Sequence, residues 1–330
     1  MGERLAWLDM ARGAGIAAVV VGHVTSDADV RAALFHFHMP LFFMLAGMMF
    51  VPAPVWQVAR RRASTLLVPY VCWLAVVALV DIVIAFFTAH PAYLPWGRPL
   101  IAMARLIFGG TFLVGPFGVF WFVTCLFGVQ LAGAAILRRP PREVLIAAAV
   151  LFLCANLVPH LPSPWGLASM PCALFFFIVG ALYKRHEVAG RPLITALAIG
   201  AAALSLVSRP LDLKIADAGT PVLSILAALG LCHLIIVVAQ SISPIKVVAT
   251  VGRASLVIMY LHLTIFYALR DHLGEVAVIA LSLGTPAALW MLLRQSSLSR
   301  RFLLGERAGH RADSGLSPPA GMLPLGNKQA

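Results

Sequence analysis

The chain has 330 residues, of which 61% are hydrophobic and only 12% are charged. In soluble proteins about a quarter of the residues are Asp, Glu, Lys or Arg. This composition therefore excludes a soluble globular domain, an intrinsically disordered chain, a secreted disulfide scaffold and a free nucleic-acid-binding domain. The formal net charge is +12, and the places where the charges fall matter more than their sum. We expect an all-α, polytopic bundle of helices whose solvent is the lipid bilayer.

Ten apolar runs come near the roughly 20 residues that a helix needs to cross a bilayer. Arg-rich or Pro/Gly-rich joints separate them, and they predict about ten transmembrane helices. In chain order the runs are 5–24, 39–56, 66–88, 114–137, 144–158, 167–183, 193–207, 221–240, 256–269 and 276–293. The stretch 99–112 is left open as an interfacial or re-entrant helix. Glu3, Asp9 and Arg12 interrupt the first run, so we expect it to be retained and not cleaved as a signal peptide.

The basic residues predict the orientation of this bundle, because loops that stay in the cytoplasm collect Lys and Arg. With ten spans and a cytoplasmic N-terminus, most of the 25 Lys and Arg fall on the cytoplasmic side. Both termini are therefore expected in the cytoplasm and the protein in the inner membrane, as a multi-pass protein. Residues 1–300 form the predicted transmembrane domain. Residues 301–330, rich in Gly, Ser and Pro, are predicted to be a disordered cytoplasmic tail.

The first span contains three ionisable side chains, Asp9, Arg12 and His23. Each costs about 2.5 to 3.5 kcal/mol to insert, so each is a functional hypothesis. Arg12 and His23 are eleven positions apart, which puts them on one helix face and about 16 Å apart along the axis. Asp9, three residues before Arg12, can reach its guanidinium group. The alternative is that Arg12 reaches the cytoplasmic headgroups while His23 lies at the outer interface.

The next span opens with further histidines in the string Phe35-His36-Phe37-His38, followed by Met39-Pro40. Proline suits the first turn of a helix, so His38 is expected at the outer mouth of the second helix, close to His23. The spacing of these imidazoles matches no metal motif, and Asp27 and Asp29 are predicted to lie in a flexible loop. We therefore expect no metal site.

These residues resemble the opening of the membrane acyltransferase 3 family, and the fucose 4-O-acetylase-like branch is the nearest part of it. The family's Arg-x10-His signature matches Arg12 and His23 without a gap. The resemblance continues in Leu66-Leu67-Val68-Pro69-Tyr70, Trp121-Phe122-Val123, Phe175-Phe176-Phe177 and Gly252-Arg253-Ala254-Ser255-Leu256, which leads to Tyr260-Leu261-His262. One departure is the contiguous Arg60-Arg61-Arg62, where many relatives have an Arg-x3-Arg pair.

The resemblance implies an O-acetyltransferase that moves an acyl group, usually acetyl from acetyl-CoA, to a hydroxyl of a carbohydrate or glycosylated acceptor. His23 would be the general base or the acyl carrier, and Asp9 would orient Arg12. Acetyl-CoA would be a co-substrate, with no bound cofactor. The further implied contacts are His38, Tyr260 and His262 for the acceptor, and Arg12, Arg60, Arg61 and Arg62 for the phosphates of coenzyme A.

Other readings of the same residues stay open at this point. The clustered arginines also suit ordinary anchoring at the cytoplasmic face, and His262 also suits a packing role. The alternative functions are a transporter with a His, Arg and Asp relay and a catalytically silent membrane partner. The sequence specifies neither the acceptor, the acyl length, the side on which the acceptor is modified nor the oligomeric state.

Overall fold

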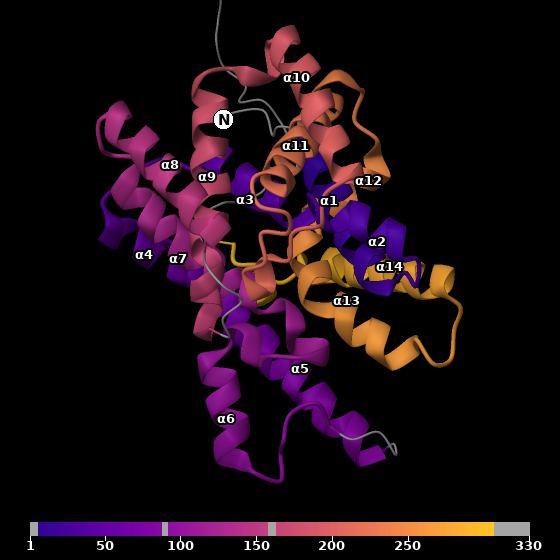
Figure 1. Ribbon diagram of the computed structural model, residues 1–330. Helices are drawn as coiled ribbons and strands as arrows, with labels where there is room; N and C mark the ends of the chain where they lie inside the picture. Colours follow the sequence, from indigo (N-terminus) through magenta and orange to yellow (C-terminus); the bar gives the residue numbers. More distant parts are fainter. Residues whose placement is uncertain (1–5, 88–91, 158–162, 307–330) are drawn as a thin grey trace, which may run out of the picture.

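The computed structural model describes residues 6–87, 92–157 and 163–306. These residues fold into a bundle of helices (Figure 1), and the described part of the chain contains no β-strand beyond an isolated bridge between Asp212 and Asp217. The predicted all-α class is therefore confirmed. The longer helices are apolar over most of their length, as the bilayer requires.

The α-helices are numbered along the chain as in Figure 1. They are α1 (Ala6–Val24), α2 (Ala28–Phe35), α3 (His38–Met48), α4 (Val55–Arg62), α5 (Val68–Phe87), α6 (Pro99–Phe108), α7 (Trp121–Ile136), α8 (Pro141–Leu157), α9 (Met170–Arg185), α10 (Pro192–Ala203), α11 (Leu223–Ser241), α12 (Lys246–Arg253), α13 (Ser255–Leu269), α14 (Glu275–Leu293) and α15 (Ser297–Phe302).

Six helical stretches of the described chain are long and apolar enough to cross a membrane. A seventh is added if α12 and α13, which meet at an angle of 81°, count as one broken span. The remaining predicted runs coincide with α1, α8 and α10, and the open stretch 99–112 contains the short helix α6. A multi-pass membrane protein is thus supported, while the count of ten spans and the position of the termini remain predictions.

Large apolar side chains on the outer surface of the bundle agree with a lipid environment. Phe86, Leu100, Leu206 and Val276 each expose 80% or more of their surface. In water, such a spread of exposed apolar side chains would mark a binding surface or an aggregation hazard. In a bilayer these side chains face lipid tails of the same polarity.

The second predicted span differs from the structure at both ends. It was expected over 39–56, but the apolar helical stretch runs over Ala28–Met48, with α2 preceding α3. The Asp27 carboxylate accepts hydrogen bonds from the backbone N–H groups of Asp29 (2.9 Å) and Val30 (3.0 Å) and so caps α2. The flexible loop predicted around Asp27 and Asp29 is therefore wrong: these residues begin a helix.

Glycines allow two helix pairs to pack with their backbones in contact. A Cβ atom at Gly47 of α3 would overlap the carbonyl oxygen of Phe177, and one at Gly180 of α9 would overlap that of Met44. A Cβ atom at Gly252 of α12 would likewise overlap a carbonyl oxygen of α1. Small residues at such contacts are typical of helix packing in membranes.

The end of the described chain packs on the start of α5. The indole N–H of Trp73 donates to the carbonyl oxygen of Leu303 over 2.9 Å, and Gly305, at a φ of +67°, lies against the carbonyl group of Thr65. Arg301 belongs to α15. The predicted tail over 301–330 therefore begins with packed residues, and 307–330 lie outside the described residues.

Candidate active site

Three predicted site residues meet in the bundle, each from a different helix. His23 comes from the last turn of α1, His38 from the first turn of α3 and His262 from the middle of α13. The ring centroids of His23 and His38 are 6.1 Å apart, and those of His23 and His262 are 5.3 Å apart. His38 and His262 are buried, whereas His23 is partly exposed. The structure thus joins residues that lie more than 200 positions apart.

Each of these three rings is oriented by a backbone carbonyl group about one turn earlier in the chain. Nδ1 of His23 lies 2.7 Å from the carbonyl oxygen of Val19. Nδ1 of His38 lies 2.9 Å from the carbonyl oxygen of Leu34, and Nδ1 of His262 lies 2.9 Å from that of Ile258. A carbonyl oxygen only accepts, so Nδ1 carries the proton and Nε2 carries the lone pair of the neutral ring. Nε2 of His262 is buried and makes no hydrogen bond to any described residue.

A cavity of about 270 Å³ opens beside His23 and His38. Apolar and aromatic side chains form much of its wall, including Trp121, Phe122 and Phe266. We call this space the histidine cavity. A mostly apolar cavity with a few polar groups is typical of a small-molecule site.

Two charged residues of the histidine cavity come from a loop between α10 and α11. Asp212 precedes the short 3-10 turn η7 (Leu213–Ile215), and its carboxylate accepts a hydrogen bond from the backbone N–H of Lys214 over 3.0 Å. Nζ of Lys214 donates to the carbonyl oxygen of Leu113 over 3.0 Å. Burial raises the pKa of the Asp212 carboxyl group and lowers the pKa of Lys214, and the opposite charge of each residue counteracts the shift of the other.

The sequence analysis did not single out Asp212 or Lys214. Both belong to a loop that charge counting alone assigns to the outer side, and nothing in the string Leu211-Asp212-Leu213-Lys214 connects it with His23. Two charges of opposite sign within an apolar stretch were the only signal. Among the residues that the structure describes, Asp212 and Lys214 are the only Asp, Glu, Lys or Arg side chains that line the histidine cavity.

Arg12 and Asp9 lie on α1, toward the end opposite His23. The helix is continuous from Ala6 to Val24, so Arg12 precedes His23 by about three turns, or about 16 Å. Arg12 is partly exposed and Asp9 is buried. Arg12 does not line the histidine cavity. The two signature residues therefore occupy two levels of one helix, and the pairing of Asp9 with Arg12 remains a prediction.

Tyr260 and the clustered arginines lie away from the histidine cavity. Tyr260 is fully buried, and its ring lies 6.0 Å from Trp73 and 5.0 Å from Phe120. Arg60, Arg61 and Arg62 end α4, so they belong to a helix where a loop was expected. The first two are exposed and Arg62 is partly buried, directly before a π-helical turn, η1 (Ala63–Leu67). Such turns are frequent at functional sites.

Comparison with known protein families gives a match that covers the residues of the candidate site. A family model described as an acyltransferase domain matches residues 5–293, which include all three histidines. The chain belongs to the acyltransferase 3 family. No curated protein and no solved structure matches it. The family assignment and the apolar helices together show that this chain is a membrane acyltransferase.

Among the described residues, no group of three or more His, Cys, Asp or Glu side chains is arranged to hold a metal ion. In all three clustered histidines Nδ1 is taken up by a backbone carbonyl group. What the arrangement offers is a set of imidazoles with a partly buried carboxylate and amine nearby. These groups suit proton transfer and acyl transfer.

Proposed function

We propose that this membrane acyltransferase is an O-acetyltransferase that moves an acetyl group from acetyl-CoA to a hydroxyl of a carbohydrate or glycosylated acceptor. The observation that carries the proposal is the His23 ring, which lines the histidine cavity and whose Nδ1–H is held by the carbonyl oxygen of Val19. This hydrogen bond leaves Nε2 as the basic nitrogen. A sugar hydroxyl needs such a base at neutral pH.

In the direct route the acceptor oxygen attacks the carbonyl carbon of the thioester. A C–O bond forms, the C–S bond breaks, and the thiolate of coenzyme A leaves. Nε2 of His23 takes the proton of the hydroxyl and returns it to the thiolate, so the ring ends neutral. His38 and His262, whose rings are oriented in the same way, would accept hydrogen bonds from the other hydroxyls of the acceptor.

In the second route Nε2 of His23 attacks the thioester first. An acetyl-imidazolium forms as the C–S bond breaks and the thiolate of coenzyme A leaves to take up a proton from water. The acceptor hydroxyl then attacks the acetyl carbon, the N–C bond breaks, and the hydroxyl proton passes through the freed Nε2 to water, so the ring ends neutral. This route lets an acetyl group cross the bilayer without coenzyme A. Arg12 and His23 are about 16 Å apart along α1. The phosphates of acetyl-CoA would bind at Arg12 while its thioester, at the far end of the molecule, reacts at His23.

The donor side of the proposal uses the arginines. In a ten-span protein with both termini in the cytoplasm of the cell, Arg12 and Arg60 to Arg62 lie on the side of the inner membrane where acetyl-CoA is found. Guanidinium groups bind phosphate oxygens through paired hydrogen bonds, and Asp9 would orient Arg12. The partly buried Arg62 is the member of the cluster best held for this role.

The substitution His23→Gln tests the proposal. Glutamine keeps a polar side chain but takes no proton, so acetyl transfer should fall by about 10² to 10⁴-fold. The measurements are the release of coenzyme A from acetyl-CoA by purified protein, and mass spectrometry of surface glycans from cells that carry either form. His186→Gln, which changes an exposed histidine, is the matched control and should leave both unchanged.

Wild-type transfer by the His23→Gln variant would refute the role of His23. Tight binding of a solute by the wild-type protein without any release of coenzyme A would instead favour the transporter, in which the same ionisable residues form a relay. An unchanged glycan mass in cells that lack the protein would favour a catalytically silent partner.

A further inference from the structure

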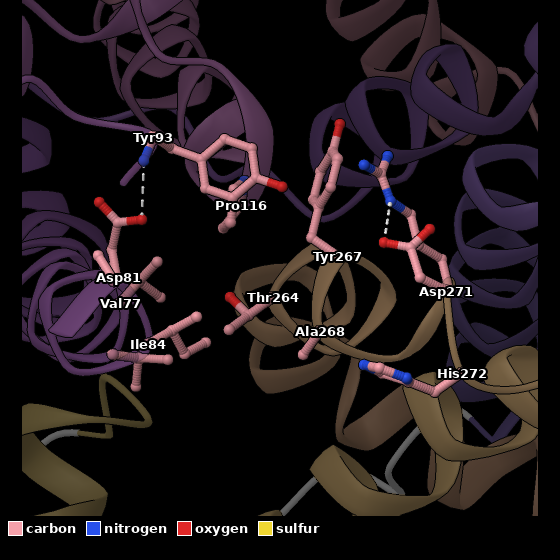
Figure 2. A pocket seen from close by; sticks show the side chains of 13 residues that line it. Val77, Asp81, Ile84, Tyr93, Pro116, Thr264, Tyr267, Ala268, Asp271 and His272 are labelled. Carbon is pink, nitrogen blue, oxygen red and sulfur yellow. Dashed lines mark hydrogen bonds and ion pairs between the residues drawn. The ribbon is translucent and has the colours of Figure 1, made fainter. Parts of the chain in front are cut away.

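A second cavity lies beside the histidine cavity (Figure 2). Its volume is about 180 Å³, and it lies between α5, the segment around Tyr93 and the C-terminal half of α13. Tyr267 lines both cavities, while Pro116 of the second is the neighbour of Gly115 of the first. The two spaces are therefore adjacent and share a wall. We call the second one the tyrosine cavity.

Helix α13 presents a separate face to each cavity. Thr264, Tyr267 and Ala268 line the tyrosine cavity at positions i, i+3 and i+4 of one stripe, and Asp271 joins them from the turn that follows the helix. Leu263 and Phe266 line the histidine cavity from the neighbouring stripe, and Tyr267 lies on the border. Tyr267 follows His262 by five residues, or about 7.5 Å along the helix axis. A ligand in the tyrosine cavity is thus separated only by the Tyr267 side chain from the cavity that His23 and His38 line.

The lining of the tyrosine cavity combines flat aromatic faces with hydrogen-bonding groups. The rings of Tyr93 and Tyr267 are 5.1 Å apart, and Thr264 lies beneath them in Figure 2. The Thr264 hydroxyl is buried and makes no hydrogen bond to a described residue. Rotation about the Cα–Cβ bond would turn this hydroxyl into the cavity that Thr264 lines, where a ligand would supply the partner it lacks. Tyrosine offers an apolar face and a polar end in one side chain, which suits a ligand of mixed polarity.

The charges at the mouth of the tyrosine cavity balance each other. The Arg270 guanidinium group lies 3.7 Å from the Asp271 carboxylate and 4.8 Å from the centre of the Tyr267 ring. His272 lines the same mouth. A paired arginine and aspartate give hydrogen-bond donors and acceptors without a net charge. The mouth therefore favours a neutral, hydroxyl-rich ligand over an anion.

Asp81 fixes one wall of the tyrosine cavity. This buried carboxylate of α5 accepts hydrogen bonds from the backbone N–H groups of Tyr93 (3.0 Å) and Leu94 (3.2 Å) and from the indole N–H of Trp96 (2.9 Å). A carboxylate inside a predicted span is costly unless it is bonded in this way. Its three bonds hold the segment that carries the Tyr93 ring, so Asp81 is a positioning residue.

We propose that the tyrosine cavity is the acceptor subsite and binds a neutral pyranose ring. The proposal rests on the acetyl transfer to carbohydrate argued above. The apolar C–H face of the sugar packs on Tyr267 and Tyr93, and its hydroxyls bond to Thr264, Asp271 and His272. The edge of the ring that carries the reacting hydroxyl and its neighbour extends past Tyr267 into the histidine cavity, where Nε2 of His23 takes the proton of the first and His38 accepts a hydrogen bond from the second.

The test uses full-length protein in lipid nanodiscs free of sugar-based detergent. The probes are the methyl glycosides of glucose, galactose and mannose, and their binding is followed by saturation-transfer NMR without acetyl-CoA. Acetyl transfer then gives kcat and separate KM values for sugar and acetyl-CoA. Tyr267→Ala should raise the KM for the sugar by about tenfold, and Thr264→Val by a smaller factor, while the KM for acetyl-CoA stays unchanged.

Two further variants keep the result interpretable. Tyr267→Phe retains the ring and should bind sugar nearly as the wild type does. Thr285→Val makes the same chemical change as Thr264→Val at an exposed site on α14 and should behave as the wild type. Each variant is compared by size-exclusion chromatography and thermal unfolding, so a misfolded protein is recognised as such.

The outcomes separate the subsite from the proposed function. Wild-type sugar KM values in both Tyr267→Ala and Thr264→Val would overturn the subsite while acetyl transfer stands. A wild-type protein that binds none of the glycosides would overturn the pyranose occupant. If the wild type binds the glycosides but never consumes acetyl-CoA, the proposed function fails. Loss of the NMR signal in the two variants would then still support the subsite, and retention of the signal would overturn it.

Discussion

Asp212 provides the negative charge that the proposed reaction needs beside its base. As His23 takes a proton from the acceptor it becomes a cation, and the Asp212 carboxylate lines the same cavity and interacts with it electrostatically. A charge that is already in place inside a site that excludes water stabilises a transition state more than the same charge would in bulk water. Because burial raises the pKa of Asp212, acidification removes this charge at a higher pH than for an exposed aspartate.

The substitution Asp212→Asn should therefore lower kcat by about tenfold or more, with little change in the KM for acetyl-CoA. Steady-state kinetics of acetyl transfer at several pH values measures this effect. The decline of wild-type activity that Asp212 protonation causes at acid pH should be absent from the variant. Asp29→Asn removes an exposed carboxylate and serves as the control. An unchanged kcat in Asp212→Asn would exclude an electrostatic role.

The histidines of the candidate site could be predicted, but the residues around them could not. His23 and His38 are polar residues in apolar helices, and this cost of insertion is visible in the sequence. Asp212 and Tyr267 become neighbours of these histidines only through the packing of helices that are far apart in the chain. Tyr260 is itself a predicted acceptor contact, two positions before His262, yet its ring packs against Trp73.

Helices α3 and α9 depend on glycine for their contact. Gly47 and Gly180 each face a carbonyl oxygen of the other helix, so neither position has room for a side chain. This contact fixes the two helices at a small separation and so fixes the first turn of α3, where His38 lies. Packing at one end of α3 thereby influences the geometry at the other.

The substitution Gly180→Val should destabilise the protein by about 1 to 3 kcal/mol, or prevent folding, because the added atoms overlap the backbone of Met44. Thermal unfolding in nanodiscs measures the loss. Gly284→Val is the matched control, because a Cβ atom at Gly284 meets no other atom within 4 Å. Equal stability of the two variants would show that the close contact between α3 and α9 is absent in the membrane.

Apolar runs predict where helices exist better than where they end. The run 39–56 continues through Pro52 and Pro54, whereas α3 ends at Met48. A count of apolar residues passes over these two prolines, but each lacks the backbone N–H that a continuing helix would use, which disfavours a helix over 49–54. The cap supplied by Asp27 was equally invisible to a count of apolar residues, since it depends on local hydrogen bonds.

Contacts across the whole molecule join loops that charge counting assigns to the same side. Ser26 donates to Glu275, His36 is hydrogen bonded to Ser208, and Lys214 donates to Leu113. All six belong to predicted outer segments. At the other end, Trp7, Lys184, Arg191 and Gln240 line one cavity, and all four lie in or beside predicted inner segments. This division into two ends is what a polytopic bundle requires.

Single cysteines test the orientation directly. Gly97, Gly190 and Gly274 are exposed and have open space around them, so a cysteine fits at each. In a variant whose five native cysteines are alanine, Gly97→Cys and Gly274→Cys should react with a membrane-impermeant maleimide in spheroplasts. Gly190→Cys should react only after permeabilisation. Labelling of all three from outside, or of Gly190→Cys alone, would overturn the predicted topology.

The anchoring of each clustered histidine to the carbonyl oxygen four or three residues before it has an evolutionary consequence. The direction of the reactive nitrogen is set by the backbone about one turn earlier in the chain and not by neighbouring side chains. Mutations that change the side chains of the cavity wall, and so admit a new acceptor, therefore leave the orientation of the imidazole ring unchanged. Specificity and chemistry can diverge separately in such a scaffold, and relatives with different substrates need not rebuild their base.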